Sequence, residues 1–311
     1  MKSDKDIRQA LQERILLLDG AMGTMLQQHG LSGNFDALNL TAPETVAAVH
    51  RAYIEAGADI IETNTFSSNR ISQEEYGLSK KAAEIALAGA LIARRAADAA
   101  PRKVWVAGSV GPTSKSLSLS TDVADAASRP ISFDEMSEVY REQIAALIEG
   151  GVDLILIETC FDALNAKAAL YAISKISWGF PAIVSVSPGD KAGRTLTGQS
   201  LEAFYTAVKH YPLTAFGLNC SLGAEELIPL VESVARFSEV PVICYPNAGL
   251  PNAMGKYDEL PGQMAASVRQ MASAGSLNIA GGCCGTTPEH IAAVKAALAD
   301  CQPRPLPQEV N

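Results

Sequence analysis

Two adjacent cysteines near the end of the chain, Cys283 and Cys284, have the clearest potential for chemistry. They are poor disulfide partners, because neighbouring Cα atoms lie about 3.8 Å apart and a relaxed disulfide needs roughly 4.4–6.8 Å. Both can instead bind one metal ion, since the glycines on either side allow the backbone conformations that this requires. The plainer interpretation is that they are small buried hydrophobic residues.

A zinc site with one open position needs a third protein ligand. Cys220 is the best candidate, because it also follows a short apolar run. An open site of three thiolates favours alkylation of an incoming thiol: the metal lowers the pKa of that thiol, and the three sulfurs already offset the metal's charge. A structural zinc would take a fourth ligand, for which Cys160 and Cys244 are candidates.

The elements around these cysteines predict an α/β fold, a (β/α)8 TIM barrel in one domain. Short apolar segments predict strands at 15–18, 59–62, 104–107, 154–158, 182–186, 215–218, 242–244 and 277–280. Amphipathic stretches predict helices at 43–56, 72–99, 133–149, 163–176, 201–210, 224–237, 261–274 and 288–299. An open doubly wound sheet is the alternative, but no G-x-G-x-x-G follows the first strand. We place the barrel at 1–301 and a Pro-rich tail or linker at 302–311.

Polar or small residues follow the predicted strands, as expected at the catalytic, C-terminal end of such a barrel. Strands six and eight would bring the three thiols together there. The connection 111–132 is too long for an ordinary loop on this face. It is either a lid or a docking element for a donor, or a passive surface loop.

Composition limits the function classes. The chain has 311 residues, a net charge of -9 and a pI near 5.0, which argues against a nucleic-acid partner. No apolar run is long enough to span a membrane, and Met1–Asp6 lacks the apolar core of a signal peptide. The six cysteines are typical of thiols or metal ligands in a reducing compartment. We therefore expect a cytoplasmic protein.

Several motifs, in this order, resemble the zinc-dependent homocysteine S-methyltransferase family. They are 18–24 (LDGAMGT), 62–66 (ETNTF), 157–159 (IET), 217–220 (GLNC) and 281–286 (GGCCGT). Two further stretches, 111–113 (GPT) and 161–167 (FDALNAK), are most similar to the N-terminal homocysteine-binding module of cobalamin-dependent methionine synthase. The resemblance covers roughly residues 12 to 300.

This resemblance implies roles for individual residues. Cys220, Cys283 and Cys284 would be the Zn²⁺ ligands, with the sulfur of L-homocysteine as the fourth. Asp19 and Glu158 would hold the substrate ammonium, with the Gly20 and Ala21 backbone near its carboxylate. Asn247 resembles a residue that can occupy zinc when homocysteine is absent, and Asn219 would support the adjacent ligand.

The implied reaction is methyl transfer to homocysteine, giving methionine. The sequence has no second barrel for methyltetrahydrofolate and no D-x-H-x-x-G cobalamin motif. Methylcobalamin would therefore come on a separate module or chain, with this chain as an independent polypeptide or an excised module. The alternatives are a small donor such as S-methylmethionine or a betaine, or a non-catalytic barrel whose glycine-rich turn after the last strand binds phosphate. The sequence does not define the donor or the oligomeric state.

Overall fold

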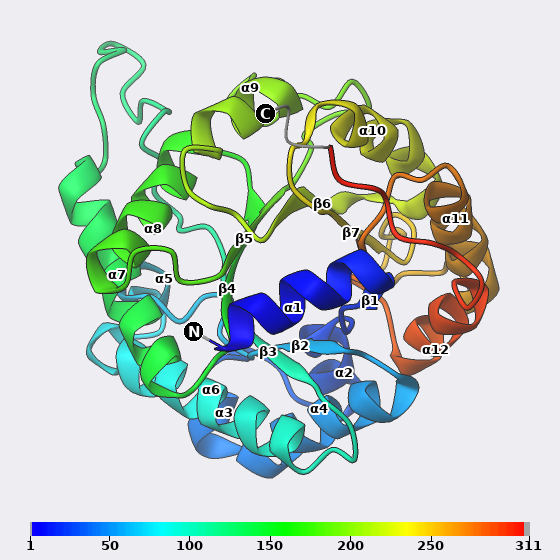
Figure 1. The fold of residues 1–311 in the computed structure, drawn as a ribbon. Coiled ribbons are helices and arrows are strands. Elements are labelled where there is room, and N and C mark those ends of the chain that lie inside the picture. Colours follow the sequence, from blue (N-terminus) through cyan, green and yellow to red (C-terminus); the bar gives the residue numbers. More distant parts are fainter. Residues whose placement is uncertain (1, 308–311) are drawn as a thin grey trace.

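Eight parallel strands form one closed sheet at the centre of the molecule (Figure 1). The computed structural model describes residues 2–307, and side chains from residue 6 onward. The strands pair in the order β1-β8-β7-β6-β5-β4-β3-β2, and a parallel bridge between Leu18 and Ile60 joins the two ends. The (β/α)8 TIM barrel is thus confirmed. The strands are β1 Leu16–Leu17, β2 Ile60–Glu62, β3 Trp105–Val110, β4 Leu154–Cys160, β5 Ala182–Val186, β6 Ala215–Gly223, β7 Val242–Asn247 and β8 Ile279–Ala280.

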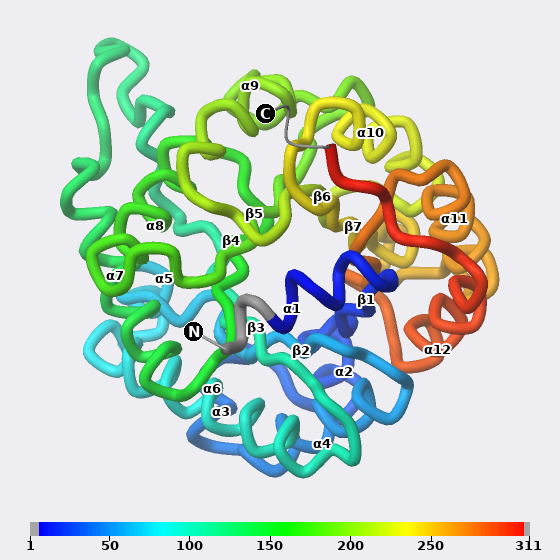
Figure 2. Tube along the Cα trace, in the orientation of Figure 1, coloured from blue at the N-terminus to red at the C-terminus, as the bar shows by residue number. Residues whose placement is uncertain are grey.

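Helices surround the barrel (Figures 1 and 2). The helices before β3 are α1 Lys2–Glu13, α2 Met22–Gln28, α3 Leu38–Thr41, α4 Pro43–Ala56, α5 Arg70–Glu74, the 3₁₀ helix η1 Ser79–Lys81 and α6 Ala82–Asp98. Those that follow are α7 Phe133–Glu149, α8 Ala163–Ile176, α9 Leu201–Val208, α10 Ala224–Phe237, α11 Pro261–Ser273 and α12 Pro288–Ala297. Helices α1, α2 and α3 were not predicted from the sequence.

The single helix predicted at 72–99 is wrong. The segment contains the end of α5, then η1 and α6. Gly77 has a φ of 68° and the next amide, that of Leu78, donates back to the Gln73 carbonyl. This left-handed glycine ends α5, because glycine adopts positive φ without the steric cost that other residues meet.

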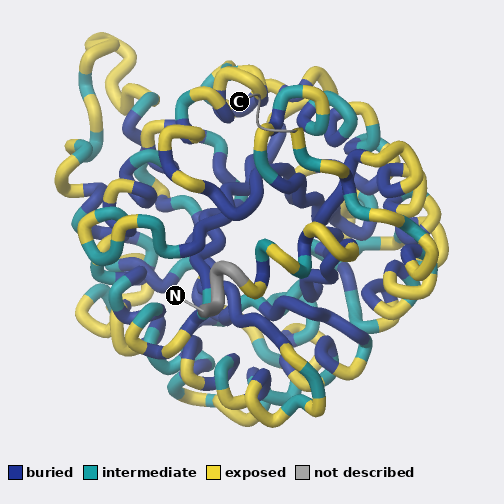
Figure 3. The backbone as a smooth tube through the Cα atoms, in the orientation of Figure 1, coloured by how far each residue is buried: buried dark blue, intermediate teal, exposed yellow. Residues whose placement is uncertain are grey.

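Helix α1 closes the N-terminal end of the barrel. It crosses the opening in Figures 1 and 2, and Figure 3 shows that the strands beneath it are buried. Ile7 and Leu11 insert into the apolar cluster inside the barrel. The Arg8 guanidinium donates to the carbonyls of Pro212 and Leu213, just before β6. The barrel is therefore a packed core at this end.

Side chains alternate between two core layers along each strand, as strand geometry requires. Leu16 and Leu18 lie in the barrel interior, whereas Leu17 packs in the layer between strands and helices. On β4, Leu154 and Leu156 likewise face inward while Ile155 faces the helices. This alternation decides which polar residues at the strand ends can point towards the barrel axis.

The first part of the 302–311 segment packs back onto the barrel. Arg304 is only 6% exposed, and its guanidinium donates to the carbonyls of Ala235, Ser238 and Val240. The Asn278 side chain donates to the Arg304 carbonyl at 2.9 Å. Residues 308–311 of this segment lie outside the described residues. Across residues 2–307, no helix has the length and apolarity needed to cross a membrane.

Candidate active site and metal centre

The three predicted thiols meet at the C-terminal end of the barrel. The Sγ atoms of Cys220, Cys283 and Cys284 all lie within 4.8 Å of one another. They come from β6 and from the turn after β8, so two segments about 60 residues apart form one cluster. Three soft sulfur ligands that leave room for a fourth ligand fit an open zinc site. The donor set therefore suits this metal, and these residues could hold it.

Cys220 reaches the cluster through an unusual backbone conformation. Strand alternation places Asn219 inward, so Cys220 would point to the helices. Instead Cys220 and Ser221 both have a φ of 61°, in the left-handed region. Such a conformation costs roughly 1–3 kcal/mol in a non-glycine residue and is common at functional sites. Here it coincides with the turn of Sγ towards the other two thiols.

A glycine after the cysteine pair allows the chain to turn sharply. Gly285 has a φ of 81°, and a Cβ at this position would lie 2.2 Å from the Cβ of Tyr257. Its amide donates to Thr24 Oγ1 at 3.0 Å, which ties the turn to α2. Thr286 Oγ1 donates to the Cys283 carbonyl at 2.7 Å. The turn thus has a defined shape in which the two thiols lie side by side.

The thiol cluster concentrates negative charge on one sulfur. Hydrogen bonds from Cys283 and then Cys284 lower the pKa of Cys220 to about 3. The same interaction with Cys220 raises the pKa of Cys284 to about 11. A thiolate that accepts hydrogen bonds from two neighbouring thiols is a site that favours a cation.

A cavity of about 450 Å³ opens from the thiols to the surface. This volume is within the usual range for a small-molecule site. The predicted residues Asp19, Gly20, Ala21 and Glu158 line it together with the three cysteines. Phe66 and Tyr76 line the outer part and are exposed. The cavity therefore runs from an acidic and thiol-rich interior to a partly aromatic mouth.

A polar layer covers the apolar interior of the barrel at this end. Its members follow inward-facing positions on the strands and are Glu62, Ser109, Glu158, Ser185, Asn219 and Tyr245. Ser109 Oγ donates to Glu158 Oε1, and the Tyr245 hydroxyl lies 3.5 Å from Glu158 Oε2. Ser185 Oγ donates to Asn219 Oδ1 at 2.7 Å. These bonds orient Glu158 and Asn219 towards the site.

Three carboxylates share the inner part of the cavity. Burial raises the pKa of Asp19 and of Glu62 well above their ordinary values, and it raises the pKa of Glu158 to about 7. The negative charge of Glu158 also raises the pKa of both Asp19 and Glu62. A buried group of like charges is stabilised by a cationic ligand.

Gly20 and Ala21 lie directly after Asp19, between α2 and the turn after β8. A Cβ on Gly20 would lie 2.7 Å from Thr286 Oγ1 and 2.8 Å from Tyr53 Cε1, so only glycine fits here. The Ala21 amide donates to Thr286 Oγ1 at 3.1 Å. The Tyr53 hydroxyl lies 3.1 Å from the carbonyl oxygens of both Ala21 and Thr286. This segment is thereby fixed against the cysteine turn.

The two predicted asparagines contact the thiol cluster and are buried beside it. Asn219 Nδ2 donates to Cys283 Sγ at 3.8 Å, and its Oδ1 accepts from the Thr159 amide at 3.0 Å. Asn247 Oδ1 accepts from the Cys284 amide at 3.1 Å. A hydrogen bond with the Asn247 side chain also helps to lower the pKa of Cys220. Both asparagines therefore position the thiols.

Sequence reasoning gave no role to Glu62, Ser109 or Tyr245. A signal was present, because each lies two residues after an inward apolar residue: Ile60, Ala107 and Ile243. Applying the two-residue strand period to the strand ends finds all three. Of these, Glu62 stands out because its Oε1 atom is buried and accepts no hydrogen bond from the described residues.

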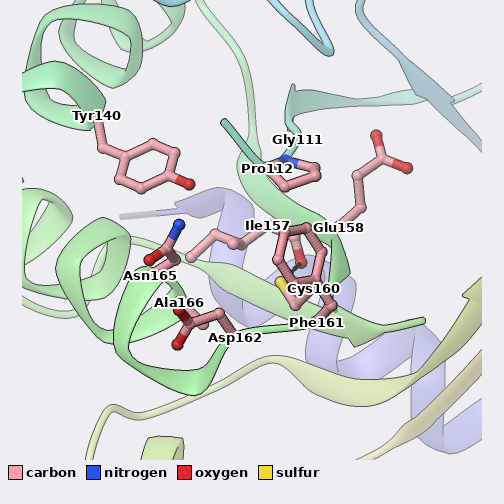
Figure 4. Close-up of a pocket in the computed structure, with 10 residues that line it drawn as sticks. All are labelled: Gly111, Pro112, Tyr140, Ile157, Glu158, Cys160, Phe161, Asp162, Asn165 and Ala166. Atoms are coloured by element: carbon pink, nitrogen blue, oxygen red, sulfur yellow. Dashed lines mark hydrogen bonds between the residues drawn. The ribbon is translucent and has the colours of Figure 1, made fainter. Parts of the chain in front are cut away.

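The long 111–132 connection is anchored behind Glu158. Figure 4 shows Ile157 directed towards Asn165, and the Glu158 carboxylate on the other side of β4. Asp162 accepts hydrogen bonds from the Ser116 hydroxyl and the Ser118 amide and hydroxyl. The cavity between these segments is about 10 Å³, enough for one water molecule at most. The base of the loop is thus fixed, and its tip extends from the barrel edge at the upper left of Figure 1.

Comparison with known proteins agrees with this geometry. The model of the homocysteine S-methyltransferase family matches residues 16–298, and the chain belongs to that family. The structure of the homocysteine methyltransferase MmuM from Escherichia coli is similar in its metallated form, with a TM-score of 0.76 and 26% identity, covering 91% of this chain and 96% of that chain. Its apo form is similar with a TM-score of 0.72 and 26% identity, covering 92% and 96% respectively. The methyltransferase class predicted from the sequence is supported.

Proposed function

We propose that this protein transfers a methyl group to the thiol of L-homocysteine, giving methionine, with Zn²⁺ held by Cys220, Cys283 and Cys284. The observation that carries the proposal is the convergence of three thiols within 4.8 Å, at the inner end of a cavity that also holds Asp19 and Glu158. A thiol-containing amino acid presents matching groups: a sulfur for the metal and an ammonium for the carboxylates.

The metal, when bound, would supply a Lewis acid that keeps a substrate thiol deprotonated near neutral pH. The chain itself supplies the orientation. Asp19 and Glu158 hold the ammonium, and the Gly20 and Ala21 backbone lies near the carboxylate. Asn219 and Asn247 fix the thiols through the contacts described above. Together these residues orient the substrate sulfur towards the cavity mouth, where a methyl donor can approach.

For the donor we propose methylcobalamin carried by another module or chain. The support is that the two segments most similar to the cobalamin-dependent branch, 111–113 and 161–167, pack against each other. Gly111, Pro112, Phe161, Asp162 and Asn165 line the same small cavity (Figure 4). Together they hold the base of the long loop, which extends from the face where a donor would arrive. We place the homocysteine-binding barrel at 1–301 and the tail or linker at 302–311.

A methyl-transfer assay tests the proposal. The zinc-loaded protein is mixed with L-homocysteine and, in separate reactions, methylcobalamin, a methylated corrinoid protein, S-methylmethionine or betaine, and methionine is measured. Methionine formed from methylcobalamin or the corrinoid protein supports the proposal. Methionine formed only from S-methylmethionine or betaine would show that the donor is a small molecule and not methylcobalamin. If the protein does not retain zinc after loading and forms no methionine with any donor, it is a ligand-binding barrel and not a methyltransferase. Because the thiols must stay reduced, the assay needs a reductant, as in a cytoplasmic setting.

A further inference from the structure

Glu62 is a carboxylate in the inner part of the cavity that the proposed roles leave unused. It ends β2 and occupies the inward position two residues after Ile60, so its side chain belongs to the polar layer. It lines the same cavity as Asp19 and Glu158. After burial, which has the largest effect, the charges of Glu158 and Asp19 both raise the pKa of Glu62. The three carboxylates therefore interact electrostatically.

Asp19 and Glu62 each keep an oxygen without a partner. The Glu62 amide donates to Asp19 Oδ2 at 3.0 Å, whereas Asp19 Oδ1 is buried and accepts no hydrogen bond from the described residues. Asp19 is 2% exposed. Glu62 Oε1 is likewise buried and accepts no hydrogen bond from the described residues. A buried carboxylate oxygen without a donor is costly, so two in one cavity indicate a ligand with several N–H groups.

Glu158 offers a third acceptor. Its Oε1 accepts from Ser109, but its Oε2 has only the long contact of 3.5 Å with the Tyr245 hydroxyl. The cavity thus contains three buried carboxylate oxygens with spare capacity, one each from Asp19, Glu62 and Glu158. A primary ammonium has three N–H donors and no acceptor, which matches this set.

We infer that Glu62 is a third ammonium-binding residue, which with Asp19 and Glu158 selects a thiol that carries an α-ammonium over a simple thiol. This inference rests on the proposed function and names the residue that sets its substrate class. Asp19 and Glu158 alone would leave one ammonium hydrogen to find a neutral acceptor. Glu62 instead gives the third N–H an anionic acceptor, so that both donor and acceptor are charged and the bond is stronger than one to a neutral oxygen.

The test compares two ligands that differ only at the amino group. Binding of L-homocysteine and of 4-mercaptobutanoate to zinc-loaded protein is measured by calorimetry, and zinc content is determined for each variant. The ratio of the two dissociation constants reports what the amino group contributes. In Glu62→Gln this preference for homocysteine is expected to fall roughly tenfold to a hundredfold, with 4-mercaptobutanoate affinity nearly unchanged. Glu74→Gln, an exposed carboxylate on α5 outside the cavity lining, is the matched control.

An unchanged ratio in Glu62→Gln would overturn the inference while leaving the proposed function intact. Failure of the wild-type protein to bind homocysteine at all would instead reject the proposed function. If the variant loses zinc, a crystal structure of the wild-type protein with L-homocysteine decides: a Glu62 oxygen within hydrogen-bond distance of the substrate nitrogen supports the inference, and a longer separation rejects it.

Discussion

Asn219 on β6 donates a hydrogen bond to Cys283 after β8, with Nδ2 and Sγ 3.8 Å apart. This bond links the two segments that carry the thiols. Asn219 is itself fixed by Ser185 and Thr159, so it holds the Cys283 sulfur in place rather than following it.

We therefore expect Asn219→Ala to weaken zinc binding by roughly tenfold to a hundredfold, the usual effect of losing a residue that orients a metal ligand. Competition with a chelator of known affinity measures this. Asn165→Ala is the control, since Asn165 is also buried but its side chain forms hydrogen bonds with the 111–132 loop. Equal zinc affinity in the two variants would contradict the role of Asn219.

The thiols themselves give the most direct prediction. Cys283→Ala removes one of three ligands, so bound zinc and methionine formation should both fall to background. Metal analysis and the methylation assay measure the two effects. Cys244→Ala serves as control, because Cys244 is buried in the outer core and lies outside the cluster. Full turnover by a zinc-free Cys283→Ala protein would reject the metal site.

The ionised carboxylate of Glu158 should lower the stability of the folded protein, although its charge should help to bind the substrate ammonium. Burial is the main reason that its pKa is about 7 in the folded protein, against an ordinary value of 4.5. The folded state therefore keeps a proton that the unfolded state loses between pH 4.5 and 7. Stability falls as the pH rises through this window, and the cost is complete above it. The shift corresponds to about 3 kcal/mol.

Glu158→Gln should thus stabilise the ligand-free protein at pH 8 and have little effect at pH 4, as measured by urea unfolding at both values. The same variant should bind homocysteine roughly tenfold more weakly, because a neutral amide oxygen replaces the anionic acceptor for the ammonium. A variant that is destabilised equally at both pH values would show that the Ser109 bond, and not the charge, dominates.

The contacts of Arg304 indicate that the start of the 302–311 segment stabilises the folded protein. Its buried guanidinium donates to one carbonyl in the last turn of α10, that of Ala235, and to two between α10 and β7, those of Ser238 and Val240. Arg304→Met should therefore lower the free energy of unfolding by roughly 2–4 kcal/mol, since buried carbonyls lose their donors. Arg269→Met, which removes an exposed ion pair with Asp300, should cost no more than about 1 kcal/mol. Similar losses in both variants would argue against the anchoring role.

The sequence predicts the barrel well because strand and helix periods are strong signals. The apolar runs place all eight strands, although β1 and β8 are shorter than expected. The cysteines could be found for the same reason: Cys220 lies near the C-terminal end of β6, Cys283 and Cys284 follow β8, and parallel strands share one catalytic end. Glu62 could have been found as well, from the two-residue period after Ile60.

Other features depend on tertiary contacts. The left-handed conformation of Cys220 is not visible in its residue type, because positive φ is normally a property of glycine. Helix α1 has only a few apolar residues, and their role becomes clear when Ile7 and Leu11 meet the barrel interior. The partnerless oxygens of Asp19 and Glu62 likewise follow from the packing of separate strands.

Closure of one end of the barrel by α1 has a kinetic consequence. If the proposed function is correct, the amino acid binds at the inner end of the cavity and the donor approaches through its mouth. A bulky donor docked there would block exchange of the amino acid, so we expect steady-state kinetics with an ordered sequence. Homocysteine would bind before the donor, and methionine would leave after the spent donor.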